Sequence, residues 1–432
     1  MILVYIAEPT PRARYVVEHV FHHMLGWDLS IVEDEEVFRR SGGAKLSYGD
    51  HPIDPSAFHI KASGWLKRSG IVGIRPEVSV KEGMPVLFPD ENGYDLLSAA
   101  FFLISRYEEY LDHPNDEHGR SLPSALFLVE HGMHERPILD EWVLQLADRL
   151  RAMYPALPAP DRVYRHVVTA DLDNGLKYLG RPFWKQCGAA IRDLVKGAPS
   201  IAQERFAVLR GKSPDPYADQ QLLIDAARSE KVFRTIAFVL VQGGTSYDHA
   251  ANIRHPAMVG SIRAMASEME IGLHPSYNSS SDPSSISREK RSLEQVLSDR
   301  VTTSRQHFLR WDLPGTLRAL EAAGIKEDHT LGFSDRIGLR AGTCTPFRWY
   351  DLQQDRISDL VLHPFASMDS ALHDRMGLRP REAVRQMITM SEAIRRVNGQ
   401  FVSVWHDRFL YGDGDRKGWP EAFKQVYEAV AP

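Results

Sequence analysis

From residue 163 onward, short apolar segments alternate with longer segments of helical periodicity, and this alternation constrains the fold most. The apolar segments are residues 167–170, 235–241, 270–273, 301–305, 330–333, 338–339, 360–362 and 401–404. Strands that alternate with helices build β-α units around a parallel sheet or barrel. The active face of such a fold lies at the carboxyl ends of its strands. We therefore expect functional side chains to follow these strands directly.

The segment 167–170 runs into two carboxylates one residue apart, Asp171 and Asp173. Side chains alternate across a strand, so both acids leave on the same face. Two acids on one face repel each other unless a positive group lies between them or one stays protonated. The pair suits a metal site with an adjacent general base. The alternative is an Asx-rich turn at Asn174-Gly175 that only closes the strand.

Basic or imidazole side chains follow several of the later strands. They are His274, His307, Arg340, His363 and His406. Imidazole nitrogens and carboxylate oxygens are the ligands that first-row divalent metals prefer. Together with the carboxylate pair, these residues predict a metal-centred pocket.

Composition excludes several classes of protein. The chain has 432 residues and a formal net charge of −5, which gives no general attraction for nucleic acid. No apolar run approaches the roughly 20 residues of a membrane-spanning helix. Residues 1–6 read as a first strand and lack the basic region of a signal peptide. With only Cys187 and Cys344, no disulfide framework is expected, and we expect a cytoplasmic protein.

The chain divides near a proline-rich segment at 155–160. Residues 1–158 are expected to form a mixed α/β accessory domain, with an amphipathic segment at 13–26 and a buried helix at 95–110. Residues 159–432 are expected to form the β-α domain.

Four motifs follow one another along the second domain, and three accompany them in the first. The second-domain motifs are Thr169-Ala-Asp171-Leu-Asp173, Ile271-Gly-Leu-His274-Pro-Ser-Tyr-Asn278, Leu339-Arg340-Ala-Gly-Thr343 and Val404-Trp-His406-Asp407. The first-domain motifs lie at 102–110, 116–120 and 136–142. In order and spacing the chain resembles the polysaccharide deacetylases of carbohydrate esterase family 4, in the bacterial branch with an additional N-terminal domain. The resemblance implies a distorted (β/α)7 barrel after a smaller mixed α/β domain.

The resemblance also implies a reaction, the metal-dependent removal of an N-acetyl group from an amino sugar or glycan. A divalent ion, zinc by default, would be held by Asp173 and His274. Asp171 would act as the general base and His406 as the general acid. Arg340 would orient Asp171 or keep it ionised.

The chain departs from the family at position 278, where Asn stands in place of a second metal-binding histidine. His307, at the end of the next strand, is the candidate substitute, and the alternative is that it only binds substrate or packs. Tyr277, Asn278, Trp405 and His363 are the expected substrate contacts. The two aromatic residues would otherwise be core residues, and His363 would otherwise only end a strand before Pro364.

Two other functions remain open from the sequence. One is a non-catalytic carbohydrate-binding or scaffold protein that keeps the fold but has lost efficient metal binding. The presence of both a base and an acid argues against it, because a binding protein needs neither. The other is a different hydrolase on the same scaffold, acting on a non-sugar amide or on a glycosidic bond.

Overall fold

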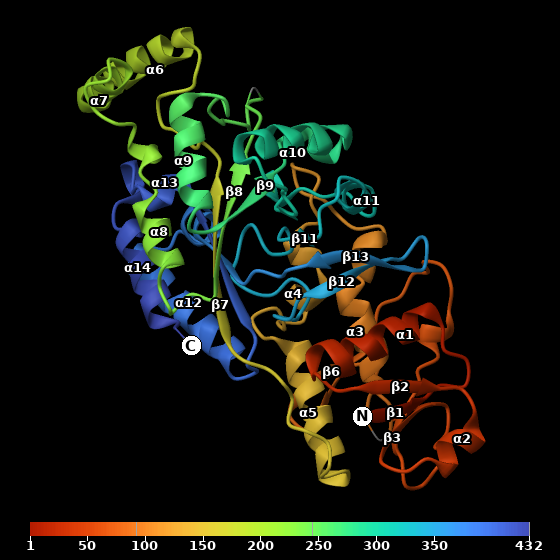
Figure 1. Ribbon diagram of the computed structural model, residues 1–432. Helices are drawn as coiled ribbons and strands as arrows, with labels where there is room; N and C mark the ends of the chain where they lie inside the picture. The colour runs from red at the N-terminus through yellow and green to blue at the C-terminus, as the bar shows by residue number, and fades with distance from the viewer. Residues whose placement is uncertain (92, 244, 432) are drawn as a thin grey trace. The chain divides into compact units, whose positions relative to one another are not determined.

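The structure of the protein is a computed structural model that describes residues 1–91, 93–243 and 245–431 (Figure 1). The chain forms two compact units. Unit 1 consists of Met1–Tyr164, Gly338–Pro364 and Glu392–Gln400, and unit 2 consists of Arg165–Ile337, Phe365–Ser391 and Phe401–Pro432. The expected division at 158/159 therefore lies near the first crossing between the units but omits two later returns to unit 1. Such returns depend on contacts between distant segments, which local sequence patterns do not display.

Unit 1 is a mixed α/β unit around a parallel sheet of order β2-β1-β3-β4. Its strands are β1 (Ile2–Tyr5), β2 (Leu29–Val32), β3 (Ala44–Gly49), β4 (Phe58–Lys61), β5 (Val78–Lys81), β6 (Met84–Leu87), β12 (Phe347–Asp351) and β13 (Arg356–Leu362). Its helices are α1 (Pro11–Val17), α2 (Glu35–Arg40), α3 (Leu96–Ile104), α4 (Phe127–Glu130) and α5 (Ile138–Met153). Every residue of α3 is buried, as its continuous apolar sequence predicts.

A buried carboxylate ties the segment after residue 338 to the N-terminal part of unit 1. Asp140, on α5, accepts hydrogen bonds from the Thr343 hydroxyl (2.7 Å) and the Cys344 amide (3.1 Å). The same carboxylate pairs with Arg162 at 2.6 Å. A buried carboxylate needs such donors because an unpaired charge away from water is costly.

Unit 2 is built on a parallel sheet of order β11-β10-β9-β8-β7-β15-β14. Its strands are β7 (Arg165–Leu172), β8 (Arg234–Leu240), β9 (Glu270–His274), β10 (Thr303–Ser304), β11 (Glu327–Asp328), β14 (Ser367–Met368) and β15 (Gln400–His406). The central strand β8 is buried from Thr235 to Leu240, which is typical of a parallel strand that is covered on both faces.

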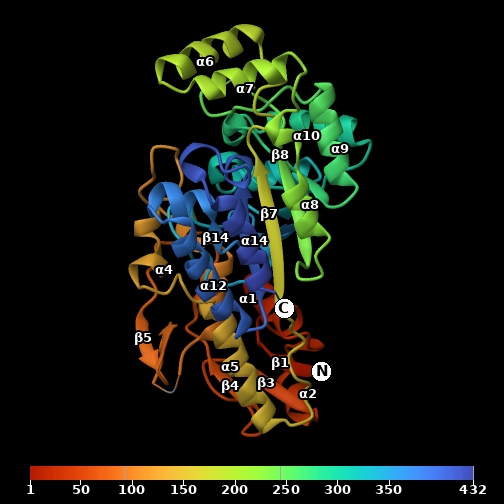
Figure 2. The same ribbon diagram turned by 90° about the vertical axis from the view of Figure 1, so that its left-hand side faces the viewer.

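Helices cover this sheet, and one helical pair stands apart from it. The helices are α6 (Phe183–Val195), α7 (Pro199–Leu209), α8 (Gln221–Ala227), α9 (Pro256–Ala266), α10 (Ser284–Leu297), α11 (Gly315–Ala322), α12 (Pro380–Arg395), α13 (Asp407–Leu410) and α14 (Trp419–Ala429). Helix α8 packs on β8 and α9 packs on β9, whereas α6 and α7 pack on each other away from the strands (Figure 1, Figure 2). In the part of the chain that the structure describes, no helix combines the length and the apolar character that crossing a membrane requires.

A closed barrel is not shown among the described residues, so the expected (β/α)7 barrel is reduced to a mixed α/β fold with a parallel sheet. Two predicted strands, 330–333 and 338–339, are irregular, and the predicted strand 301–305 shortens to the two residues of β10. Leu331 and Phe333 are buried without strand pairing. Burial alone therefore explains their apolar character, which the sequence analysis interpreted as a strand signal.

Candidate metal and catalytic site

The carboxyl ends of the unit 2 strands bring together five of the predicted side chains. Asp171 and Asp173 come from the end of β7, and His274 is the last residue of β9. His307 follows β10, and His406 is the last residue of β15. All five are buried. The parallel arrangement places these strand ends at one edge of the sheet, as expected for a site of this fold class.

Three of these side chains point one ligand atom each at a common position. Asp173 Oδ1 lies 3.4 Å from His274 Nε2 and 3.5 Å from His307 Nε2. These atoms all lie within 4.8 Å of one another. Asp173 Oδ1 is buried and has no hydrogen-bond partner among the described residues. Buried polar atoms normally have a partner, and a cation between the three atoms would supply it.

The other nitrogen of each histidine is held by a hydrogen bond that fixes the ring. His274 Nδ1 lies 2.5 Å from the carbonyl oxygen of Arg305, and His307 Nδ1 lies 2.8 Å from Asp248 Oδ1. Both acceptors require a proton on Nδ1, so in the neutral ring Nε2 is the nitrogen that remains to bind a cation. This outer layer is the usual arrangement around metal-binding histidines. Asp248 is fixed in turn by the Thr245 hydroxyl at 2.7 Å.

Asp171 lies beside this position, with the properties of a general base. Its Oδ1 accepts a hydrogen bond from Arg305 Nη1 at 2.8 Å, and both side chains are buried. Burial favours protonation, but the charges of Arg305, His274 and His406 outweigh it and lower the pKa of Asp171. The carboxylate is therefore ionised at neutral pH and can accept a proton.

In unit 2, the guanidinium that pairs with Asp171 is that of Arg305. Arg340 lies in unit 1, where its Nη2 is 2.7 Å from Glu109 Oε2. Glu109 also pairs with Arg106 at 2.5 Å. Arg340 is therefore part of a buried ion-pair network of unit 1.

His406 lies on the other side of Asp171, with its Nε2 4.0 Å from Asp171 Oδ2. Asp369 Oδ1 is 2.5 Å from His406 Nδ1, and Asp369 Oδ2 accepts the His406 backbone N–H at 2.7 Å. Burial and the charge of Arg408 lower the pKa of His406, but the carboxylates of Asp369 and Asp173 together outweigh them and raise it to about 9. His406 is consequently protonated at neutral pH and can donate a proton from Nε2.

The predicted substrate contacts divide into two groups. Tyr277 is partly exposed and lies near the site, because its backbone N–H donates to Asp248 at 2.9 Å. Asn278 is exposed in the turn that follows. Trp405 is buried against Phe423, and His363 follows β13 in unit 1. Tyr277 therefore lies at the site through its contact with Asp248, whereas Trp405, although it directly precedes His406, is a core residue.

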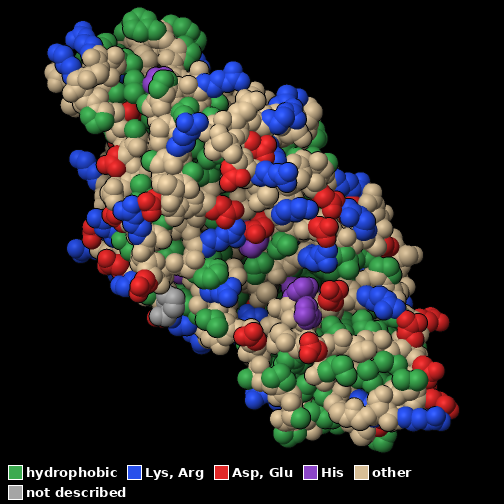
Figure 3. Space-filling view, viewed as in Figure 1, with side chains coloured by type: hydrophobic (Ala, Val, Ile, Leu, Met, Phe, Trp, Pro, Cys, Tyr) green, Lys and Arg blue, Asp and Glu red, His purple; other side chains and the backbone are tan. Residues whose placement is uncertain are grey.

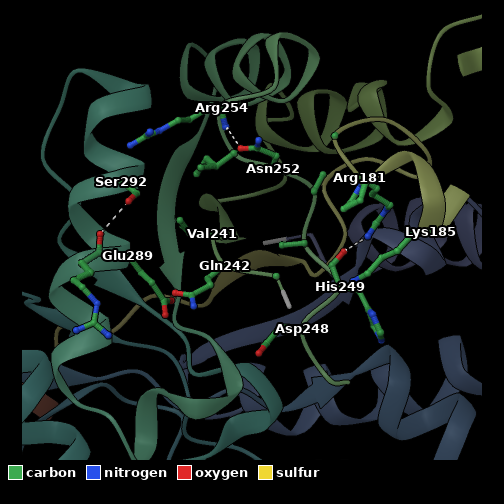
Figure 4. A pocket seen from close by; sticks show the side chains of 17 residues that line it. Arg181, Lys185, Val241, Gln242, Asp248, His249, Asn252, Arg254, Glu289 and Ser292 are labelled. Atoms are coloured by element: carbon green, nitrogen blue, oxygen red, sulfur yellow. Dashed lines mark hydrogen bonds between the residues drawn. The ribbon is translucent and has the colours of Figure 1, made fainter. Parts of the chain in front are cut away.

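A cavity of about 710 Å³ adjoins the site, and Asp248 forms part of its wall (Figure 4). Other lining residues are Arg181, Lys185, Gln242, His249 and Arg254. Its wall is tied to the loop after β7 by backbone hydrogen bonds from Ala251 to Asn174 (3.0 Å) and from Asn252 to Gly180 (2.8 Å). These hydrogen bonds connect the cavity wall to the segment that directly follows Asp171 and Asp173.

Sequence analysis missed four charged residues of the site: Asp248, Arg305, Asp369 and Arg408. Arg408 Nη1 binds Asp173 Oδ2 at 3.0 Å and holds the carboxylate whose other oxygen faces the histidines. A sequence signal existed only for Arg305, which ends a predicted strand, and for Arg408, which stands two residues after His406. Asp248 lies in a loop, and Asp369 follows a strand of only two residues, β14.

Comparisons with known proteins give one family match and several structural similarities. Residues 2–155 match a family of unknown function, DUF7033. No curated protein matches the chain. The chain is 17% identical to a Mycobacterium smegmatis protein assigned as a polysaccharide deacetylase, over 64% of this chain and 87% of that one, with a TM-score of 0.41. The chain is 10% identical to a family 4 carbohydrate esterase from Streptomyces lividans, over 62% of this chain and 88% of that one, with a TM-score of 0.30. It is 12% identical to the chitin deacetylase of Colletotrichum lindemuthianum, over 62% of this chain and 83% of that one, with a TM-score of 0.32.

These TM-scores do not establish a shared fold. The evidence for function therefore lies in the geometry of the site.

Proposed function

We propose that the protein is a metal-dependent hydrolase that removes an N-acetyl group from an amino sugar or glycan. The observation that carries the proposal is the buried, unpartnered oxygen of Asp173 facing the Nε2 atoms of His274 and His307. A base and an acid flank the same position, since Asp171 Oδ2 lies 4.0 Å from His406 Nε2. A site that only bound sugar would need neither group.

Asp173, His274 and His307 would hold the ion, and one oxygen with two nitrogen donors suits zinc or a similar first-row cation. When bound, such a cation supplies Lewis acidity toward an amide carbonyl and toward water. Asp173 keeps its orientation through Arg408, and the histidines keep theirs through Asp248 and a backbone carbonyl.

The two remaining groups handle the protons of hydrolysis. Asp171, kept ionised by Arg305, accepts a proton from the water that adds to the acetyl carbonyl. The carbon–nitrogen bond then breaks, and His406 donates the proton from Nε2 to the departing amine. The products are acetate and a free amino sugar. His406, with its pKa of about 9, has this proton available at neutral pH.

The test combines metal analysis with acetate release from a panel of N-acetylated amino sugars and oligosaccharides. We expect stoichiometric metal in the wild type, and no metal in Asp173→Ala or His274→Ala. Asp171→Asn should keep the metal but lose activity by about 10²- to 10⁴-fold, the usual contribution of a general base. The matched control is Asp225→Asn, a change at an exposed carboxylate of α8 that should alter neither property.

Two results would contradict the proposal. Full activity in Asp171→Asn would show that Asp171 is not the general base. A wild type that binds metal and sugar without releasing acetate from any member of the panel would favour the carbohydrate-binding alternative.

A further inference from the structure

Helix α6 presents its apolar face to solvent. The exposed fractions are 75% for Phe183, 69% for Trp184, 64% for Ile191, 54% for Leu194 and 82% for Val195. Positions 184, 191 and 195 recur at helical spacing, and 183 and 194 lie beside them, so the side chains form one stripe along the helix. Figure 3 shows hydrophobic side chains gathered over this part of unit 2.

The opposite face of α6 is polar and packs inward, the reverse of an ordinary surface helix. Gln186 is buried and accepts a hydrogen bond from Arg205 Nη1 at 2.6 Å. Arg205, on α7, also pairs with Asp193 at 2.8 Å. These polar contacts, with the buried Ala190 and Ala202, hold α6 against α7. The arrangement of α6 is therefore fixed with its apolar stripe outward.

A stripe of this kind calls for a partner, because contiguous exposed apolar side chains mark interaction sites. The charge of the hairpin formed by α6 and α7 favours an anionic partner. Residues 183–212 contain six Lys or Arg and two Asp or Glu, a net charge of +4 in a chain whose net charge is −5. Both acids are already paired, Asp193 with Arg205 and Glu204 with Lys177. The exposed cations Lys196 and Arg210 thus face solvent beside the stripe.

We propose that the α6–α7 hairpin docks on the surface of a membrane that contains anionic lipids, with α6 lying in the interfacial plane. Basic residues beside Trp, Phe and Leu are the composition of helices that lie in a membrane interface. Lys is depleted in interfaces between proteins, which makes a protein partner the less suitable occupant. The proposal is independent of the reaction that the site catalyses.

The docked surface would stand next to the cavity of the site. Lys185 lies on α6 and Arg181 immediately precedes it, and both line that cavity. The hairpin would therefore hold the entrance of the cavity close to the lipid headgroups.

The test is co-sedimentation of the full chain with vesicles of phosphatidylcholine alone and of an equimolar mixture with phosphatidylglycerol. We expect binding to the mixed vesicles that weakens at high salt, because screening shortens the reach of the cations. The double variant Ile191→Asp, Leu194→Asp should lower the partition coefficient by about tenfold or more, since it removes the two apolar anchors. Arg192→Gln with Lys196→Gln should lower it by about 30-fold, from roughly 1 kcal/mol for each of the two cations. Val80→Asp, at a 68% exposed valine of β5, is the matched control and should bind like the wild type.

Failure of the wild type to bind mixed vesicles, or equal binding by the Ile191→Asp, Leu194→Asp variant, would overturn the proposal. So would self-association of the wild type that this variant abolishes, because the stripe would then be covered by a second copy of the chain. Circular dichroism of both double variants checks that the hairpin remains folded. All of the substituted side chains are exposed, so their replacement should leave the fold intact.

Discussion

Replacing Asp369 with Asn should lower the pKa of His406 and reduce the dependence of the unfolding free energy on pH. The Asp369 carboxylate is the strongest influence that raises this pKa, while burial and the charge of Arg408 lower it. Without that carboxylate, burial and Arg408 still lower the pKa, and the Asp173 carboxylate still raises it. The substitution leaves the size of the side chain nearly unchanged, so the comparison isolates the charge.

The magnitude follows from the pKa. His406 has a pKa of about 9 in the folded protein and a model value of 6.5. At about 1.4 kcal/mol per pH unit, this interval corresponds to roughly 3 kcal/mol of unfolding free energy. Because the folded pKa is the higher one, this stabilisation is fully present below pH 6.5 and is lost as the pH rises through about 9. In Asp369→Asn the loss over this window should be smaller.

The assay is urea unfolding from about pH 6 to about pH 10, in the presence of a chelator, for the wild type and Asp369→Asn. The readout is the change in unfolding free energy with pH, since the Asn amide also opposes the His406 backbone N–H and lowers stability at every pH. Asp215→Asn is the control, because the buried Asp215 accepts hydrogen bonds from the backbone of Lys177 and Tyr178. It should be less stable but keep the wild-type pH dependence. Equal pH dependence in the wild type and Asp369→Asn would refute the reasoning.

Three further predictions concern other charged groups. Arg305→Met should raise the pKa of Asp171, because it removes the neighbouring cation, and should therefore move the acidic limb of the pH–rate profile to higher pH. Asp248→Asn should weaken metal affinity by about 10- to 100-fold, the usual effect of removing the carboxylate that orients a histidine ligand, as a competition titration with a chelator can measure. Asp140→Asn should cost about 3 to 5 kcal/mol of unfolding free energy, because it leaves the buried Arg162 unpaired. A loss below about 1 kcal/mol in urea unfolding would contradict this last expectation.

Residues at strand ends could be selected from the sequence because the signal there is local. An apolar strand that ends in a polar residue was enough to select Asp171, Asp173, His274, His307 and His406, and the structure gathers all five at one edge of the unit 2 sheet. Their roles as ligands, base and acid stay predictions. The mixed α/β character of the chain was predictable on the same grounds, from the alternation of strands and helices.

The outer residues of the site were not predictable in this way. Asp248 lies in a loop between β8 and α9, and Asp369 follows a strand of only two residues, β14. Asp248 shows no periodicity, cap or motif, and the sequence around Asp369 indicates at most a helix cap. Each acquires its importance from a contact with a histidine distant in sequence, 59 residues away for Asp248 and 37 for Asp369. Sequence patterns identify the atoms that face a site more readily than the atoms that hold them in place.

Arg340 and Arg305 show the limit of selecting residues by strand ends alone. Both arginines end a segment that the sequence marks as a strand, and a guanidinium at either position has the chemistry to keep Asp171 ionised. The choice depends on which segment the chain folds into unit 2. Residues 338–364 belong to unit 1, where Arg340 pairs with Glu109, whereas Arg305 follows β10 in the sheet that carries Asp171. A strand end identifies a functional residue only when the sheet that contains the strand is known.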